Sequence, residues 1–311
     1  MFASLAFLAA LQQIVVPLGK PPPQVEKPSA PIELNGPLFA SACKDWDDWD
    51  KPAPPVRIHA NTFLVGTCGI SSILITGEQG DVLIDGGTEA GADLIAGNIR
   101  KLGFRLTDVK YILQSHEHID HVGGVARLQR LTGAQVVASR AAAKVLTTGV
   151  ANPEDPQAGM QKPIPLARVD RIIEDGGQVR LPDILLTAVA TPGHTPGALT
   201  WRWESCKAGI CRSMVYADSL TPVSRDDYRF SDHPEYLAAF RASIAKVATL
   251  PCEILLTPHP SASDMVKRLA LAKVDTPNQC VDYAAGLTKA LDARLAKEAA
   301  GQKPTPEPAK Q

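Results

Sequence analysis

The sequence of 311 residues lacks three features that would place it in a broad class of proteins. Its formal net charge is −1 and it has no stripe of clustered Lys and Arg, so we expect no nucleic-acid partner, because phosphate binding needs such clusters. No apolar run approaches the roughly twenty residues of a membrane-spanning helix, so we expect no membrane span. No cysteine stands in a C-x-x-C pair, which argues against a zinc ribbon or a thioredoxin-like redox site.

The six cysteines are even in number, which makes them candidates for disulfide bonds. Six cysteines allow fifteen connectivities, and proximity in the sequence favours one of them. The favoured pairs are Cys43 with Cys68, Cys206 with Cys211, and Cys252 with Cys280. Bridged cysteines would indicate an oxidising compartment, whereas reduced and buried thiols are the alternative.

The N-terminal residues 1–19 contain an apolar stretch without an early Lys or Arg, which resembles a secretory signal peptide with a weak basic start. An ordinary amphipathic segment is the alternative. Residues 20–37 are rich in proline and are expected to form a linker, residues 38–300 one domain, and residues 301–311 a disordered tail. Together with the cysteines, the N-terminal segment favours export to the periplasm.

The pattern of apolar residues changes along the chain. Short strands rich in branched residues, separated by glycine-containing turns, predict hairpins over residues 56–85, and strands and helices then alternate to residue 147. Residues 149–167 form a proline-dotted loop of the kind that often acts as a lid. A second strand-rich half begins at Arg168, with strands predicted over 171–174, 178–181, 184–190, 199–203, 213–217 and 254–257. Helices are predicted over 90–102, 122–132, 139–147, 234–249, 263–271 and 283–300. We therefore expect an α/β fold in four layers, with two face-packed sheets and helices outside them.

Four potential metal ligands lie within residues 116–121, directly after the apolar run 109–113. His116 and His118 are two residues apart, so on an extended backbone they point to the same side and can share one metal ion. Asp120 and His121 follow where the chain begins to turn. Being adjacent, they cannot both join the first pair without strain, so a second metal ion beside the first is the simplest interpretation.

A polar loop with solvated histidines and a closed structural zinc site are the alternatives for this stretch. Structural zinc sites usually recruit cysteine, and no cysteine lies here. An aspartate among the ligands, and more donors than one tetrahedral ion can use, favour a catalytic centre with an open coordination position.

Two further histidines follow predicted strands and complete the ligand set. His194 lies in the run Thr-Pro-Gly-His-Thr-Pro-Gly after strand 184–190, and His259 follows strand 254–257. The ligands predicted for one zinc ion are His116, His118 and His194, and those predicted for the other are Asp120, His121 and His259. His59 and His233 are interpreted as surface or satisfied core residues.

Together these motifs resemble the metallo-β-lactamase superfamily. The resemblance rests on His116-x-His118-x-Asp120-His121, on residues 193–197, on residues 216–220 and on His259. In its details it is closest to subclass B3, because Ser219 and Thr221 are present without a metal-binding cysteine, and because the export signal and the cysteine pairs are similar to those of some B3 enzymes. The resemblance implies an αββα sandwich of two mixed sheets, with helices on the outer faces, that carries two Zn²⁺ ions.

The function that the resemblance implies is opening of the β-lactam ring of penicillins, cephalosporins and carbapenems by attack of a zinc-bound hydroxide. We expect a monomer. Asp120 would orient the hydroxide as well as bind metal, and Ser219 and Thr221 would bind the carboxylate of the β-lactam substrate.

Three other residues receive weaker assignments. The resemblance implies that Asp85 supports the metal-binding loop from beneath. Asp218 is similar to an aspartate that bridges two metals in thioester hydrolases, but the B3-like context places it outside the metal ligands. Gln157 of the long loop is interpreted as a solvated residue, and contact with the substrate is the alternative.

Two other functions remain open at this point. The same metal ligands occur in thioester hydrolases and lactonases, so a hydrolase of either class is the alternative function. A non-catalytic zinc-binding protein would need its open metal positions blocked, and nothing in the motifs indicates such a block.

Overall fold

A computed structural model describes residues 36–44 and 48–302 of the chain. These residues all belong to one compact unit, Ile32–Gln311. The expected signal peptide over residues 1–19, most of the expected linker and most of the expected tail lie outside the described residues. Within the described part, no helix has both the length and the apolar character needed to cross a membrane.

Two β-sheets form the centre of the fold, and each mixes antiparallel and parallel pairs. In the first sheet the strands follow chain order: β1 (Val56–His59), β2 (Thr62–Leu64), β3 (Ile73–Ile75), β4 (Asp81–Ile84), β5 (Val109–Leu113), β6 (Gln135–Ala138) and β7 (Arg171–Ile172). The second sheet has the order β12 (Ile254–Leu256), β11 (Ile210–Tyr216), β10 (Leu199–Lys207), β9 (Ile184–Ala190) and β8 (Gln178–Leu181). The first sheet is antiparallel up to β4 and parallel from β4 to β7, so the predicted hairpins over residues 56–85 are confirmed.

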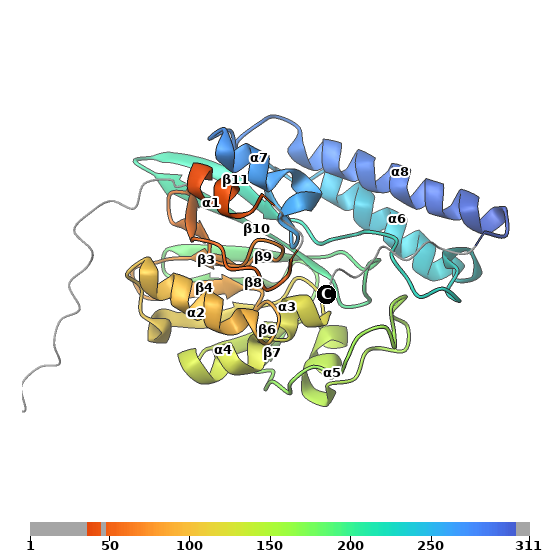
Figure 1. Cartoon of the computed structure of the whole chain (residues 1–311), viewed down its shortest axis with the longest axis horizontal. Helices are drawn as coiled ribbons and strands as arrows, with labels where there is room; N and C mark the ends of the chain where they lie inside the picture. The colour runs from red at the N-terminus through yellow and green to blue at the C-terminus, as the bar shows by residue number, and fades with distance from the viewer. Residues whose placement is uncertain (1–35, 45–47, 303–311) are drawn as a thin grey trace, which may run out of the picture. The chain divides into compact units, whose positions relative to one another are not determined.

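Helices cover the outer faces of both sheets (Figure 1). The helices on the first sheet are α2 (Gly91–Lys101), α4 (Val125–Thr132) and α5 (Arg140–Thr148), and those on the second are α6 (Pro234–Ala248) and α8 (Gln279–Ala299). Shorter helices are α1 (Gly36–Ala42), α3 (Ile119–Val122) and α7 (Met265–Ala270), with 3-10 turns at Leu106–Asp108, Phe230–Asp232 and Pro260–Ser263. The predicted αββα sandwich is confirmed.

Alternation of side chains along the strands builds the layers. On β3, Ile73 and Ile75 face the second sheet and pack in one buried cluster with Leu186 and Trp201. Leu74 between them faces the opposite way, into the cluster beneath α2 and α4. This two-residue period is what a strand buried on both faces requires. The strands are therefore held between two separate apolar layers, and their ends are free to carry polar groups.

Three predictions about elements need correction. The strand predicted at residues 171–174 belongs to the first sheet and not to the second half, because β7 pairs with β6. The helix predicted over 122–132 begins earlier and in two pieces, α3 and α4. The C-terminal helix α8 begins at Gln279, before the predicted start at residue 283. Helix α1, which was not predicted, starts at Gly36 within the expected linker, and Gly36 is required because a Cβ there would lie 2.1 Å from the carbonyl oxygen of Leu269 on α7.

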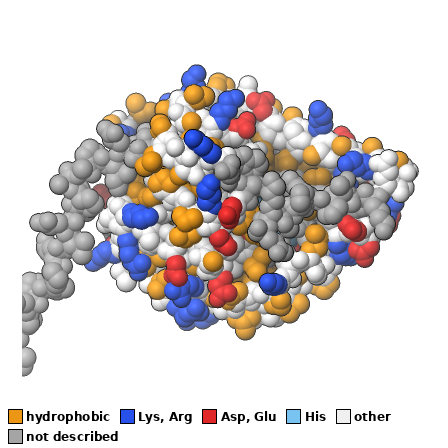
Figure 2. All heavy atoms as spheres, viewed as in Figure 1, with side chains coloured by type: hydrophobic (Ala, Val, Ile, Leu, Met, Phe, Trp, Pro, Cys, Tyr) orange, Lys and Arg blue, Asp and Glu red, His pale blue; other side chains and the backbone are white. Residues whose placement is uncertain are grey.

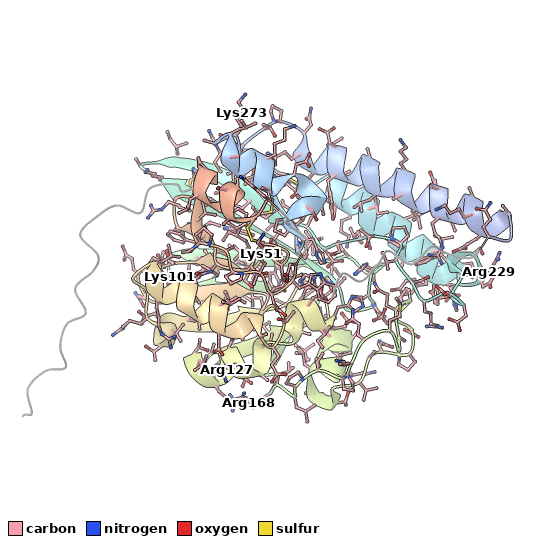
Figure 3. All side chains as sticks on the ribbon, in the orientation of Figure 1. Lys51, Lys101, Arg127, Arg168, Arg229 and Lys273 are labelled. Atoms are coloured by element: carbon pink, nitrogen blue, oxygen red, sulfur yellow. A yellow bond between two sulfur atoms is a disulfide. The ribbon has the colours of Figure 1, made fainter. Side chains whose placement is uncertain are left out.

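Charged side chains of both signs are interspersed on the visible face of the molecule. Figure 2 shows Lys and Arg mixed with Asp and Glu on the face in view, and the basic residues labelled in Figure 3 lie on different elements. Several of them are paired, as Arg127 is with Asp93 and Arg168 is with Asp170, with N–O distances of 2.7 Å in both pairs.

All six cysteines are described, and they form the three disulfides that proximity in the sequence favours. Cys43–Cys68 joins the end of α1 to the loop after β2, and Cys206–Cys211 closes the tip of the β10–β11 hairpin. Cys252–Cys280 joins the residues before β12 to the first turn of α8. The predicted pairing is confirmed.

We expect the Cys252–Cys280 bridge to contribute more stability than the bridge at the hairpin tip. Replacing both cysteines of the former with Ser should lower the free energy of unfolding by about 2 to 5 kcal/mol. The Cys206→Ser, Cys211→Ser variant is the control and should lose about 1.5 kcal/mol less, because its sequence separation is 5 and not 28, so it restricts the unfolded chain less. Urea unfolding of both variants measures the difference, and equal losses would contradict this account.

Candidate metal centre

The ligand-rich run 116–121 follows the C-terminal end of β5, a strand inside the first sheet. His116 and His118 lie on the extended segment after the strand, while Asp120 and His121 lie in the first turn of α3. The turn that follows needs glycine, because a Cβ on Gly124 would lie 2.2 Å from the carbonyl oxygen of Gly86. The end of β4 and the start of α4 can thus meet directly behind the ligands.

Asp85 holds this run in place. Its carboxylate accepts hydrogen bonds from the backbone N–H of Ser115 at 2.6 Å and from the Ser115 hydroxyl at 2.7 Å. The Tyr216 hydroxyl, from β11 of the second sheet, donates to the same carboxylate at 2.7 Å. Asp85 itself is fully buried and has a positive φ of 64°. The predicted supporting position of Asp85 therefore agrees with its contacts, which also connect the two sheets at the site.

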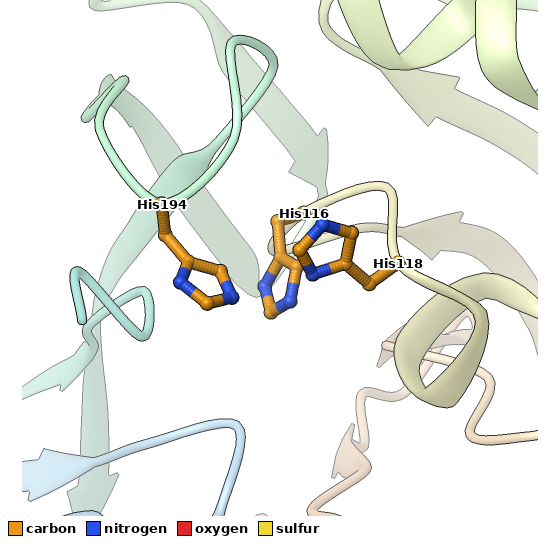
Figure 4. Close-up of side chains that lie close together, drawn as sticks. All are labelled: His116, His118 and His194. Carbon is orange, nitrogen blue, oxygen red and sulfur yellow. The ribbon is translucent and has the colours of Figure 1, made fainter. Parts of the chain in front are cut away.

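His116, His118 and His194 converge on one point (Figure 4). Their ring centroids lie 4.8 to 4.9 Å apart, and each can offer one nitrogen such that the three nitrogens lie within 4.8 Å of one another. All three are buried. The structure thus brings together residues that are up to 78 positions apart, as the sequence predicts.

In each of these histidines one ring nitrogen contacts a neighbouring oxygen, which leaves the other nitrogen for a metal ion. His116 Nδ1 lies 2.9 Å from Asp218 Oδ1, and His118 Nε2 lies 2.9 Å from Asp155 Oδ2. His194 Nδ1 lies 3.0 Å from the carbonyl oxygen of Thr221. Such partners fix the tautomer and the ring orientation of a metal-binding histidine. The nitrogens left for a metal ion are Nε2 of His116, Nδ1 of His118 and Nε2 of His194.

Burial keeps two of these imidazoles neutral. It lowers the pKa of His194 to about 3, and it lowers the pKa of His116 well below its usual value, with the neighbouring histidines acting in the same direction. Burial would also lower the pKa of His118, but the hydrogen bond and the charge of Asp155 outweigh it and raise that pKa. Neutral imidazole is the form that binds a metal ion, so His116 and His194 are poised for it at neutral pH.

Asp120, His121 and His259 form a second group beside the first. His121 Nε2 and His259 Nε2 lie 3.0 and 3.3 Å from Asp120 Oδ2, and 3.3 Å from each other. The rings of His121 and His116 are 4.2 Å apart, so the two groups adjoin. Although burial opposes it, the charge of Asp120 raises the pKa of His121 to about 10, and a metal ion bound here would therefore displace a proton.

The donors fit a bound metal ion. His116 Nε2 and Asp120 Oδ1 are buried and have no hydrogen-bond partner among the described residues. An unsatisfied buried polar atom costs roughly 1 to 3 kcal/mol, so two at one point need an external partner. Histidine nitrogens with one carboxylate are typical ligands of zinc in catalytic sites.

Of the two predicted substrate-binding residues, Thr221 contacts His194, and only Ser219 keeps a free hydroxyl among the described residues. Ser219 Oγ is buried and lacks a partner in the described part of the chain. The Thr221 hydroxyl instead lies 3.1 Å from His194 Nδ1, so its side chain is used to position a histidine. A role of Thr221 in substrate binding stays a prediction beside this contact.

The interpretation of Gln157 changes, whereas Asp218 keeps its predicted place outside the metal ligands. Gln157 is buried, and its amide nitrogen lies 3.4 Å from His194 Nε2, so its interpretation as a solvated residue is wrong. Asp218 is fully buried at the back of the site, where burial raises its pKa to about 6. Its Oδ1 atom contacts the His116 ring.

Sequence patterns did not identify two buried carboxylates of the site, Asp155 and Glu117. Asp155 lies in the loop 149–167, which was expected to be functional but carries no ligand motif. Glu117 accepts hydrogen bonds from the Thr195 hydroxyl at 2.7 Å and from the Gly197 N–H at 2.9 Å, which ties the loop of His116 to the loop of His194. The position of Glu117 between the predicted ligands His116 and His118 was the one sign in the sequence that it belongs to the site.

A family model described as the metallo-beta-lactamase superfamily matches residues 65–259. The chain belongs to this superfamily. Solved metallo-β-lactamases resemble it over nearly their whole length. MIM-2 is 54% identical with a TM-score of 0.82, over 85% of this chain and 98% of that chain. MIM-1 from Novosphingobium pentaromativorans is 46% identical with a TM-score of 0.82, again over 85% and 98%. MEM-A1, a subclass B3 metallo-β-lactamase from a soil metagenome library, is 42% identical with a TM-score of 0.79, over 82% and 100%. The predicted kinship with subclass B3 is confirmed.

Curated members of the superfamily are more distant. A probable metallo-hydrolase of Burkholderia pseudomallei (strain 1710b) is 29% identical over 154 residues, which is 45% of this chain and 49% of that protein. A hydroxyacylglutathione hydrolase of Bradyrhizobium sp. (strain ORS 278) is 28% identical over 204 residues, which is 65% of this chain and 64% of that protein. The chain thus spans about half to two thirds of the length of these relatives.

Asp155 should strengthen metal binding through His118. Asp155→Asn keeps the size of the side chain but removes the charge that holds His118 Nε2, so we expect the affinity for the first metal ion to fall about tenfold. Competition with a chromophoric chelator measures the affinity. The exposed neighbour Glu154 provides the control, Glu154→Gln, which should leave the affinity unchanged. Equal affinities for the two variants would show that Asp155 does not support the ligand.

Proposed function

We propose that this protein is a zinc-dependent hydrolase that opens the β-lactam ring of antibiotics. Two adjoining groups of metal ligands, in a chain that matches solved metallo-β-lactamases over 98 to 100% of their length at 42 to 54% identity, carry the proposal. The amide of a strained four-membered ring is the bond cleaved, and water is the other reactant.

The six predicted ligands would hold two zinc ions, one in each group. His116, His118 and His194 form the first group, and Asp120, His121 and His259 form the second. Zinc bound by such residues supplies Lewis acidity, which polarises a substrate carbonyl and lowers the pKa of a bound water. The first group consists of three imidazoles, whereas the second includes a carboxylate, so the two positions differ in charge.

The chain supplies orientation and hydrogen bonds around that chemistry. Asp120 Oδ2 faces His121 and His259, while Asp120 Oδ1 is free to accept a hydrogen bond from the attacking water and to fix its direction. Ser219 Oγ, buried and unpaired within the described residues, is available to donate to the carboxylate of a β-lactam. Thr221 and Asp218 hold the histidines and leave these two groups to meet the substrate.

A thioester or lactone hydrolase is the second candidate. The hydroxyacylglutathione hydrolases among the curated relatives favour it, since they are 28 to 34% identical to this chain. Their alignments cover a smaller share of either protein than those of the solved β-lactamases do, which makes the β-lactam the better supported substrate.

Three disulfides support export to an oxidising compartment, the periplasm, for a protein of this family. The segment 1–19 would serve as the signal peptide. We propose a monomer as the active form.

A substrate panel tests the function. Purified protein should hydrolyse a penicillin, a cephalosporin or a carbapenem with kcat/KM orders of magnitude above that for a glutathione thioester and an acyl-homoserine lactone, because only the β-lactams place a carboxylate beside the scissile amide for Ser219. Absorbance assays measure the ring opening and the thioester cleavage. Faster turnover of the thioester or the lactone would replace this proposal with the second candidate.

Metal content tests the two-ion site. The protein should carry close to two zinc ions per chain, and Asp120→Asn should lower kcat at least a hundredfold while its free energy of unfolding changes little, because a neutral amide is a weaker ligand and a weaker acceptor for water. Elemental analysis and steady-state kinetics give both quantities. Asp93→Asn, which removes an exposed ion pair with Arg127, is the control and should alter neither. Full activity with one ion would refute the second position.

A further inference from the structure

The segment 218–222 carries Ser219 and Thr221 past the metal ligands, and its backbone is strained. Leu220, between these two residues, has a positive φ of 45°, which a branched side chain rarely adopts. A residue is held in such a conformation only when its surroundings determine it several times over, and such residues concentrate at functional sites. The question is therefore what holds Leu220.

Helix α8 contacts the backbone on both sides of Leu220. The Tyr283 hydroxyl lies 2.9 Å from the carbonyl oxygen of Asp218 and 2.8 Å from that of Ser219, and its one proton is shared between these two acceptors. Arg294, three turns further along the helix, donates to the carbonyl oxygen of Pro222 at 3.0 Å. Two side chains of one rigid element thus bracket the strained residue.

The Leu220 side chain belongs to an apolar cluster to which the same helix contributes. It is fully buried in the cluster that contains Ala284, Leu287 and Leu291 of α8. A buried leucine side chain resists rotation of its own backbone, because leaving the cluster would expose apolar surface. Two hydrogen-bonding side chains of α8 therefore bracket the left-handed residue, and its own side chain is buried in a cluster to which α8 contributes.

Arg294 also holds the chain that follows. Its guanidinium donates to the Ser224 hydroxyl at 2.8 Å and to the Tyr228 carbonyl at 2.7 Å, and it is paired with Glu298 at 2.7 Å. The Glu298 carboxylate accepts from the N–H groups of Phe230 and Ser231 at 3.0 and 2.9 Å.

Both charged groups are buried, with 7% of Arg294 and 1% of Glu298 exposed. A buried ion pair contributes little net stability compared with an apolar replacement, because both charges lose their hydration. Stability alone is thus a weak reason for this pair, whereas its polar contacts are directed at the backbone from residue 222 to residue 231. Positioning of that backbone accounts for its presence.

We infer that the C-terminal helix α8 is a working part of the active site, and that Tyr283 and Arg294 are positioning residues that hold Ser219 and Thr221 toward the metal ligands. The inference rests on the proposed role of Ser219 in substrate binding. Tyr283 acts at the Ser219 carbonyl and so on substrate binding, while Arg294 acts one residue after Thr221, whose carbonyl and hydroxyl hold His194.

Tyr283→Phe provides the sharpest test, since it removes one hydroxyl and keeps the packing of the ring. We expect KM for a β-lactam substrate to rise about three- to tenfold, the effect of one neutral hydrogen bond, with kcat within twofold of wild type and zinc content unchanged. Amide hydrogen exchange should accelerate in the peptide that contains residues 218–224 and not in the peptide that contains residues 116–121. Tyr111→Phe on β5 is the matched control and should change none of these quantities.

A double-mutant cycle separates this inference from a general loss of stability. Ser219→Ala should raise KM about tenfold or more, and adding Tyr283→Phe to it should change KM by less than twofold if Tyr283 acts through Ser219. Multiplication of the two effects, or an unchanged KM in Tyr283→Phe, would overturn the inference. If the wild-type protein hydrolyses no β-lactam, the proposed function fails instead, and unchanged hydrogen exchange over residues 218–224 in Tyr283→Phe would then overturn the positioning role separately.

Discussion

The arrangement of the site depends on the hydrogen bonds that the carboxylate of Asp85 accepts. This carboxylate receives hydrogen bonds from Ser115, which precedes the ligand run, and from Tyr216 of the opposite sheet. This shared acceptor connects the end of β5 to the end of β11. The connection matters because the predicted ligands come from loops after strands of both sheets. Asp85 is fully buried, so no water can replace these donors. Ser115 and Tyr216 must therefore stay within hydrogen-bonding distance of its carboxylate.

The predicted metal ligands themselves lower the stability of the folded chain. Histidine rings and carboxylates are packed at one edge with several of their polar atoms left unpaired within the described chain, and each such atom opposes folding. The apolar layers around the sheets and the three disulfides offset this cost. Metal binding would satisfy the unpaired atoms, so part of the stability of the folded protein would be supplied by its cofactor.

Local patterns predict most of this molecule, and long-range packing explains the rest. The bounds of β8 and β9 follow from alternation within the strand, and the metal ligands are recognisable because four of them are crowded into one run after β5. The two-residue strand β7 is different, since only its pairing with β6 decides the sheet to which it belongs. Asp155 contacts the ring of His118, and the Thr221 hydroxyl contacts the ring of His194. Both residues lie in loops without periodicity, so the local sequence gives no sign of these contacts.

The position of α8 at the end of the chain sets the order in which the site can mature. Tyr283 and Asp218 are separated by 65 residues, and Arg294 and Pro222 by 72. Until α8 has docked, the strained segment with Ser219 and Thr221 lacks the hydrogen bonds from Tyr283 and Arg294. Such distant pairings close late in folding because the loop between them must first be ordered. A chain clipped between His259 and α8 would retain every strand and every predicted metal ligand, and would still lack the side chains that hold the segment of Ser219.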